Sequence, residues 1–116
     1  ISVTKDEHPD WGILGLARLD SQVAVISTYR TRRGVSVRVS RQRTVKVATH
    51  ELGHALGLPH DDSVAGCMMN DAGGTVRTVD RETGAPCRHE REAIEARTGV
   101  DLPDVTALDW DAVLGR

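Results

Sequence analysis

Aromatic side chains and long apolar runs are both scarce in this chain of 116 residues. It contains two Trp, one Tyr and no Phe. A hydrophobic core must therefore be built from Val, Leu, Ile and Ala, and a platform of aromatic rings that stack on nucleic-acid bases is not expected. No apolar run approaches the roughly 20 residues that span a bilayer, and no secretory signal is recognisable. We expect neither a membrane segment nor a nucleic-acid partner.

The chain also lacks a strong charge of either sign, since its formal net charge is -2. This balance indicates no general attraction to nucleic acid or to membranes. A length of 116 residues suits one compact domain and is too short for two. We expect a single, monomeric domain over residues 1–116, in the cytoplasm or secreted. The first residue is Ile1 rather than Met, so we expect that a preceding part was removed.

Cysteine is nearly absent, because Cys67 and Cys87 are the only two. Two cysteines are too few to define a disulfide framework. They could form a disulfide, stay reduced or bind a metal, and the redox state of the compartment decides among these. A bridge between them would close a loop of about 20 residues and stabilise the fold by about 3 kcal/mol.

Apolar patterning in the first part of the chain predicts strands. Short apolar runs at residues 13–18 and 23–28 are separated by Asp20 and Ser21, which indicates a strand pair. Val35, Val37 and Val39 then alternate with polar residues. Alternation with a period of two is typical of a half-buried strand, so we expect another strand here.

From Thr44 onward the apolar period changes to that of a helix. Apolar residues recur at three- and four-residue steps, at Val45, Ala48, Leu52 and Leu56. Thr44 is a candidate N-cap, and Gly57 followed by Pro59 ends the pattern. The sequence therefore predicts a helix over residues 45–57.

The second half of the chain has less regular patterning. Residues 61–86 are rich in Gly and predict irregular loop. A short charged helix is expected over residues 88–97, with Ala93, Ile94 and Arg97 on its inner side and its end at Gly99. The last residues predict a tail anchored by Trp110.

One segment of eleven residues carries metal-site chemistry: His50-Glu51-Leu52-Gly53-His54-Ala55-Leu56-Gly57-Leu58-Pro59-His60. Residues four apart lie about 40° apart around a helix, so His50 and His54 can face one ion from consecutive turns. A catalytic zinc has three protein ligands and one open position. His60 is the third candidate if the chain bends back at Gly57, where glycine permits a tight turn.

Glu51 lies next to the first candidate ligand but points about 100° around the helix, away from direct ligation. A carboxylate there can take a proton from water as the water attacks a carbonyl polarised by zinc. The residues themselves therefore predict one catalytic zinc ion and hydrolysis of a peptide bond. A module that binds zinc without catalysis, and a zinc hydrolase of a non-peptide amide, remain open.

The eleven-residue segment resembles the extended zinc signature of metzincin peptidases, and the chain is most similar to archaemetzincins among them. That resemblance implies an α+β fold, with a small twisted mixed sheet over a zinc-binding helix, a Met-turn and a C-terminal helix. Cys67-Met68-Met69 is similar to the Cys-x-Met form of the turn, which implies that Met69 is the Met-turn residue. A Met that merely fills a gap in the core is the alternative, and for Met68 we prefer it.

The resemblance continues upstream of the zinc signature, at Gly15-Leu16-Ala17 and Ala24-Val25-Ile26-Ser27. It implies that an edge strand of the sheet binds extended peptide substrate. We place that edge at Val23, Ala24, Val25, Ile26 and Ser27. Antiparallel main-chain pairing there would give affinity with little demand on substrate sequence.

The chain departs from the archaemetzincin pattern in two ways. Archaemetzincins carry a second, structural zinc site of four cysteines, whose first cysteine directly follows the third histidine. Here that position is Asp61, and only Cys67 and Cys87 remain, so a second zinc is not expected. The front of the domain is also short. Snapalysin-like peptidases, in which a disulfide straddles the Met-turn, are the second choice, although their third ligand is normally Asp.

A few other residues have a functional and a plain interpretation. Asp61 could orient a ligating imidazole or be a solvated loop carboxylate. Tyr29 could stabilise an oxyanion if it reached the cleft, and His8 and His89 are expected to be ordinary histidines. No acidic residue lies between Asp20 and Glu51. The basic residues of that stretch could steer acidic substrates, but we prefer a solvated strand face and loop. They are Arg30, Arg32, Arg33, Arg38, Arg41, Arg43 and Lys46.

Overall fold

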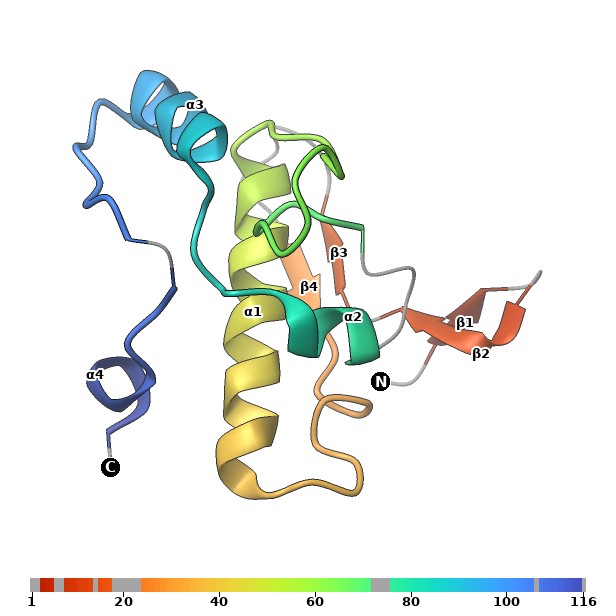
Figure 1. Ribbon diagram of the computed structural model, residues 1–116. Helices are drawn as coiled ribbons and strands as arrows, with labels where there is room; N and C mark the ends of the chain where they lie inside the picture. Colours follow the sequence, from red (N-terminus) through yellow and green to blue (C-terminus); the bar gives the residue numbers. More distant parts are fainter. Residues whose placement is uncertain are drawn as a thin grey trace.

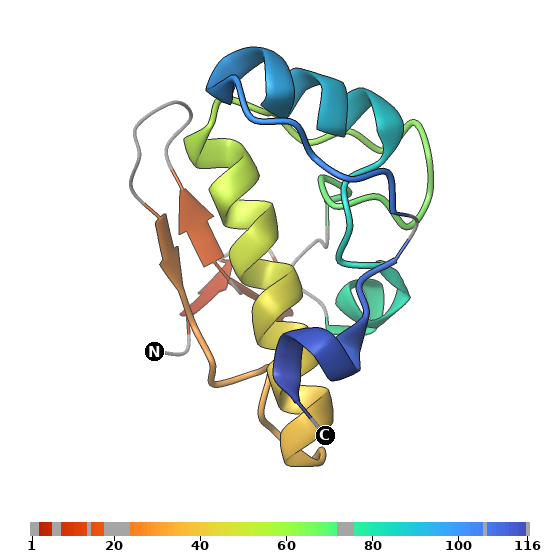
Figure 2. The ribbon, with the colours of Figure 1, turned by 90° about the vertical axis from the view of Figure 1, so that its left-hand side faces the viewer.

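The computed structural model describes residues 3–5, 8–13, 15–17, 24–71, 76–105 and 107–115. A long helix, α1, runs through the middle of the molecule, and the other elements surround it (Figures 1 and 2). In chain order the elements are β1 (Val3–Lys5), β2 (His8–Ile13), β3 (Gly15–Ala17), β4 (Ala24–Ile26), α1 (Val37–Ala55), α2 (Val76–Arg81), α3 (Arg88–Thr98) and α4 (Trp110–Leu114).

The described strands form two antiparallel pairs. β1 pairs with β2, and β3 pairs with β4 in the register Gly15 to Ile26 and Ala17 to Ala24. The strand pair expected from the apolar runs at residues 13–18 and 23–28 is therefore confirmed where the chain is described. The expected mixed sheet is not seen in these residues, because both described sheets have two antiparallel strands.

Helix α1 begins earlier than the sequence predicts. Its N-cap is Ser36, whose side chain accepts a hydrogen bond from the amide of Val39. The strand expected from the alternating valines is thus wrong, and Val37 is 66% exposed at the start of the helix. Thr44 is not a cap, since its hydroxyl donates to the carbonyl of Ser40 inside the helix. The strand prediction failed because it considered only the alternation of the valines and not the ability of Ser36 to cap a helix.

Ion pairs with distant residues hold the N-terminal half of α1. Arg38 binds Asp111 at 2.8 Å, and Arg43 makes a two-pronged contact with Asp80 at 2.8 and 2.7 Å. Lys46 lies over the ring of Trp110, 5.7 Å from its centroid. Arg38 and Arg43 therefore lie on a helix and pair with carboxylates, rather than on the solvated strand face that we expected.

Two small apolar clusters pack against α1. In the first, Val47 and Val79 are buried and contact Ile26 and Val76. In the second, Leu58, Met68 and Met69 are buried, with Leu56, Ala93 and Ile94 packed around them. The second cluster lies at the C-terminal end of α1, where α3 crosses (Figure 2). It joins α1, the following loop and α3 into one unit.

The second half of the chain agrees in part with expectation. Helix α3 ends at Gly99, whose φ of 72° is in the left-handed region, and Ala93 and Ile94 pack inward, as predicted. Arg97 lies against Gly57 and donates to its carbonyl oxygen. Helix α2 was not predicted within residues 61–86. Trp110 begins α4 and contacts Gly84, so the expected anchor is confirmed, but the expected loose tail is wrong because Trp110–Leu114 is helical. No described helix has the length and apolar character that a membrane span requires.

Candidate metal centre

Helix α1 brings His50 and His54 together, one turn apart on the same face. Their ring centroids are 4.7 Å apart and their planes are nearly perpendicular, at 89°. His50 is 9% exposed. This is the arrangement that the four-residue spacing predicts.

The chain turns back after α1 and adds His60 to the pair. Gly57 makes the turn with a φ of 97°, a conformation that side chains disfavour. The ring of His60 lies 5.1 Å from that of His50 and 4.6 Å from that of His54, between centroids. One ring nitrogen from each of the three histidines lies within 4.8 Å of the others. The three imidazoles therefore converge, and the bend at Gly57 allows it.

The outer nitrogens of two rings are held by backbone carbonyls. Nδ1 of His50 donates to the carbonyl oxygen of Met68 at 2.8 Å, and Nδ1 of His54 donates to that of Leu58 at 2.7 Å. A carbonyl oxygen can only accept, so each Nδ1 carries the proton. Each Nε2 is then left with a free lone pair, which is the form of histidine that binds a metal.

The geometry of these nitrogens fits zinc. Nε2 of His50 and Nε2 of His60 are 3.2 Å apart. Two ligand nitrogens of a tetrahedral zinc, each about 2.0–2.1 Å from the metal, are separated by about 3.3 Å. The pKa of His50 is lowered to about 4, above all by burial and also by the neighbouring His54 and His60, while the hydrogen bond to Met68 opposes this effect. A neutral ring, ready to bind a cation, is the stable form of His50 at neutral pH.

Glu51 lies beside the three histidines with its carboxyl group buried. The residue is 6% exposed, and among the described residues its Oε2 has no hydrogen-bond partner. Burial raises the pKa of Glu51, and the nearby His54 opposes this effect. This carboxylate oxygen, unpaired among the described residues, keeps its full capacity to accept a proton. The arrangement thus combines three convergent nitrogens with an adjacent base.

Sequence reasoning missed the part played by Gly15. A Cβ atom added to Gly15 would lie 2.7 Å from Cγ and 2.9 Å from Oε1 of Glu51. Strand β3 therefore passes directly over the carboxyl group of Glu51, and only a glycine allows this approach. The sequence carries one weak signal for it, a glycine at the start of an apolar strand.

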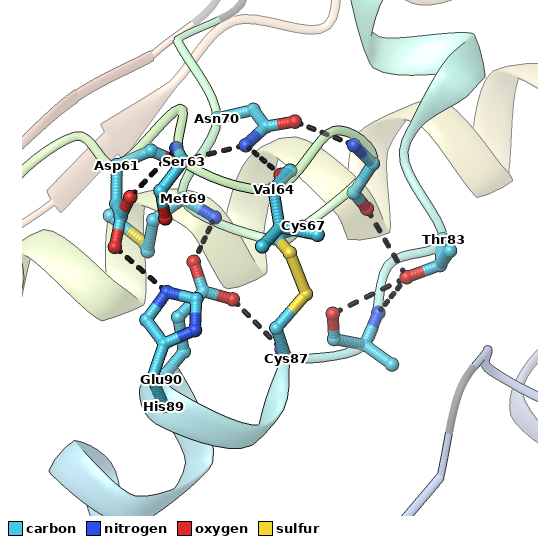
Figure 3. The surroundings of a disulfide bond; sticks show 12 residues. Asp61, Ser63, Val64, Cys67, Met69, Asn70, Thr83, Cys87, His89 and Glu90 are labelled. Carbon is cyan, nitrogen blue, oxygen red and sulfur yellow. Dashed lines mark hydrogen bonds and ion pairs between the residues drawn. A yellow bond between two sulfur atoms is a disulfide. The ribbon is translucent and has the colours of Figure 1, made fainter.

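Met69 is fully buried next to the zinc-signature helix. A Cβ on Gly53 would collide with Sδ of Met69, so the methionine packs directly on the helix backbone between the two histidine turns. Met68 is 5% exposed and supplies the carbonyl that holds His50. The preceding Cys67 forms a disulfide with Cys87, with a Cα separation of 5.4 Å (Figure 3). Of the three states left open by the sequence, the structure has the disulfide.

The loop carboxylates differ in position from the simplest expectation. Asp61 does not hold a candidate ligand through its hydrogen bonds. Its Oδ2 lies 2.7 Å from Nε2 of His89, and its Oδ1 accepts from the amide of Ser63 (Figure 3). Asp71 lies closer to the role considered for Asp61, because its Oδ2 is 3.8 Å from Nδ1 of His60. Which of the two carboxylates faces His60 depends on the path of the chain after that residue, and the spacing of residues in the sequence does not reveal this path.

The other residues singled out from the sequence are not part of the histidine cluster as described. Tyr29 is 40% exposed in the loop between β4 and α1, and its role in the cleft stays a prediction. Val23 and the side chain of His8 lie outside the described residues. The remaining substrate-strand candidates, Ala24 to Ser27, lie in β4 and just after it. Because β4 pairs with β3, they are close to the strand that covers Glu51.

A family model described as metallopeptidase family M12 matches residues 4–83. Archaemetzincin from Halobacterium salinarum is 43% identical over 83 residues, which cover 65% of this chain and 47% of that protein. The part of the chain that the family model matches includes the histidine-rich segment, since it extends past Met69.

The chain is also similar to solved structures of an archaemetzincin and of a zinc-dependent peptidase. The crystal structure of archaemetzincin from Methanopyrus kandleri aligns with a TM-score of 0.70 and 30% identity, over 77% of this chain and 48% of that one. A structure described as a zinc-dependent peptidase from Methanocorpusculum labreanum aligns with a TM-score of 0.68 and 26% identity, over 80% of this chain and 49% of that one. The chain thus spans about half the length of the relatives it matches.

Proposed function

The chain belongs to metallopeptidase family M12, and from this premise we propose that it is a zinc-dependent endopeptidase that hydrolyses peptide bonds. One observation carries the proposal. One ring nitrogen from each of three imidazoles lies within 4.8 Å of the others, and a buried carboxylate oxygen of the adjacent residue Glu51 is unpaired among the described residues. A site built only to hold a metal has no need of such a base.

In this proposal His50, His54 and His60 hold one zinc ion. Bound zinc polarises a substrate carbonyl and lowers the pKa of water towards 7. Glu51 accepts a proton at Oε2 from the water that attacks the carbonyl carbon. It then donates that proton to the amide nitrogen as the carbon–nitrogen bond breaks, which leaves a carboxylic acid and an amine. Burial, which raises the pKa of Glu51, favours the protonated state between these two steps.

The chain's other residues position this machinery. The carbonyls of Met68 and Leu58 orient His50 and His54, and Met69 packs beneath them on Gly53 in the place that a Met-turn residue would take. The β3–β4 pair lies over Glu51, so we propose that an extended peptide pairs with the edge of β4 that no described strand covers, around Ala24 to Ser27. Such main-chain pairing would fix the scissile bond near Glu51.

The proposal is tested by incubating the zinc-loaded protein with denatured casein. We expect cleavage that a chelator abolishes and added zinc restores. Glu51→Gln should lower the rate at least 100-fold, because general acid–base catalysis contributes about 10²–10⁴-fold, while zinc binding persists. Glu92→Gln, which removes a 60% exposed carboxylate of α3, is the matched control and should keep full activity.

Two outcomes would favour the alternatives. Tight zinc binding without cleavage of casein or of short peptides would indicate a zinc-binding module. Chelator-sensitive hydrolysis confined to small non-peptide amides would indicate an amidohydrolase. Cleavage that survives in Glu51→Gln would exclude Glu51 as the base.

A further inference from the structure

A single peptide group, the one between Met68 and Met69, is hydrogen-bonded at both ends to functional side chains. Its carbonyl oxygen accepts from Nδ1 of His50 at 2.8 Å. Its N–H donates to Oε2 of Glu90 at 2.9 Å (Figure 3). A buried carboxylate and a candidate metal ligand are therefore joined through one amide, although 40 residues separate them in the chain.

Glu90 is held firmly in this position. It is 2% exposed, and its other oxygen, Oε1, accepts from the amide of Cys87 at 2.9 Å. It lies in the first turn of α3, where the helix dipole favours a negative charge. The disulfide joins Cys87 to Cys67, the residue before Met68, so the carboxylate and the peptide group are tied together a second time.

The arrangement has an electronic consequence for His50. A hydrogen bond to an ionised carboxylate is stronger than one between neutral groups. It polarises the amide and makes the carbonyl oxygen at its other end a better acceptor. A better acceptor at Nδ1 makes Nε2 a more basic ligand and fixes the orientation of the ring.

The other backbone-held histidine lacks this device. Nδ1 of His54 donates to the carbonyl of Leu58, whose amide nitrogen belongs to Pro59 and carries no hydrogen. Because this peptide group has no N–H, no carboxylate can polarise it through a hydrogen bond. Among the contacts of the described residues, His50 is the histidine linked to a carboxylate through a peptide group, whereas His60 faces Asp71 directly, at 3.8 Å.

We propose that Glu90 is a positioning residue of the metal centre, which strengthens His50 as a ligand through the Met68–Met69 peptide. The inference rests on the proposed role of His50 as a zinc ligand. Glu90 also caps α3, so its test must separate an effect on the metal from an effect on stability.

The first experiment compares Glu90→Gln with the unsubstituted protein. A glutamine keeps the shape but loses the charge, and its NH₂ group cannot accept from either amide. We expect the zinc dissociation constant, from competition with a chelator, to rise about 10-fold or more, as for other groups that support a metal-ligating histidine. The visible absorption bands of the cobalt-substituted protein should also shift.

A second variant controls for lost helix capping. Ser36→Ala removes the N-cap of α1 and should lower the melting temperature of the metal-free protein. Its zinc dissociation constant should stay within about twofold of the original, given the distance of the cap from the three histidines along the helix. If Glu90→Gln behaves like Ser36→Ala, with reduced stability and unchanged zinc affinity, Glu90 only caps α3 and the inference is wrong.

A measurement on the unsubstituted protein avoids any dependence on how the variants fold. Zinc at Nε2 makes Nδ1–H a stronger donor, which strengthens the chain of bonds to Glu90. The amide proton of Met69 should therefore shift downfield in NMR spectra on zinc binding, and more than that of Cys87. An unmoved Met69 signal in a protein that does bind zinc overturns the inference alone. Failure to bind zinc at all overturns the proposed function, and this inference with it.

Discussion

The backbone of Gly15 lies against the carboxyl group of Glu51. A Cβ atom at Gly15 would be 2.7 Å from Cγ of Glu51, which is too close for any side chain. Strand β3 thus covers the proposed base with its backbone, although Gly15 precedes Glu51 by 36 residues in the chain. At this contact the backbone of Gly15 limits where the carboxyl group of Glu51 can lie.

Gly15→Ala should therefore impair catalysis and spare metal binding. The added methyl group must displace the carboxyl group of Glu51, and misplacement by about 1 Å can cost about 100-fold in rate. We expect kcat/KM for a peptide substrate to fall at least tenfold, with the zinc dissociation constant unchanged. A variant of full activity would show that Glu51 works in another position.

Gly53→Ala should destabilise the protein, contrary to the usual effect of this change in a helix. Alanine normally favours a helix by about 1 kcal/mol over glycine. Here the new Cβ collides with Sδ of the fully buried Met69, and overpacking costs about 1–3 kcal/mol. Denaturant unfolding measures the difference. Leu52→Ala, at a neighbouring position that is 56% exposed, should change the free energy of unfolding much less.

Reduction of the disulfide should lower stability without abolishing the fold. Cys67 and Cys87 are 20 residues apart in sequence, and a bridge of this span stabilises by about 3 kcal/mol. Unfolding by urea with and without a phosphine reductant measures this contribution. The double variant Cys67→Ser, Cys87→Ser should be as unstable as the reduced protein and indifferent to the reductant. A reductant effect that persists in it would point to another cause.

Glu82 should make stability fall as the pH rises from about 4.5 to 8. Burial raises the pKa of Glu82 to about 8 in the folded protein, while the unfolded side chain has an ordinary pKa near 4.3. In this window the folded state binds the extra proton, so the free energy of unfolding falls by at most about 1.4 kcal/mol for each pH unit. Below the window both states are protonated and the penalty is absent.

Glu82→Gln should remove this dependence. Oε1 of Glu82 is buried, with no hydrogen-bond partner among the described residues, and an amide carries no charge to desolvate. Unfolding of both proteins at pH 5 and pH 8 should show the variant more stable at pH 8 and similar at pH 5. Equal slopes in the two proteins would mean that other groups set the pH dependence.

The sequence predicted the local parts of the candidate metal centre. The four-residue spacing of His50 and His54 places both on one helix face whatever surrounds the helix, because the period of 3.6 residues is a property of the backbone. The return of His60 followed from Gly57 for a similar reason, since glycine alone tolerates that turn well. The end of α3 at Gly99 was readable in the same way.

Tertiary packing decided the rest. The N-terminal half of α1, whose first residues were predicted as a strand from Val35, Val37 and Val39, is held by ion pairs to Asp80 and Asp111, 37 and 73 residues further along the chain. The contact of Gly15 with Glu51 and the hydrogen bond from Met69 to Glu90 likewise join segments distant in sequence. Spacing encodes contacts within one or two helical turns, whereas these depend on where separate elements meet after the chain has folded.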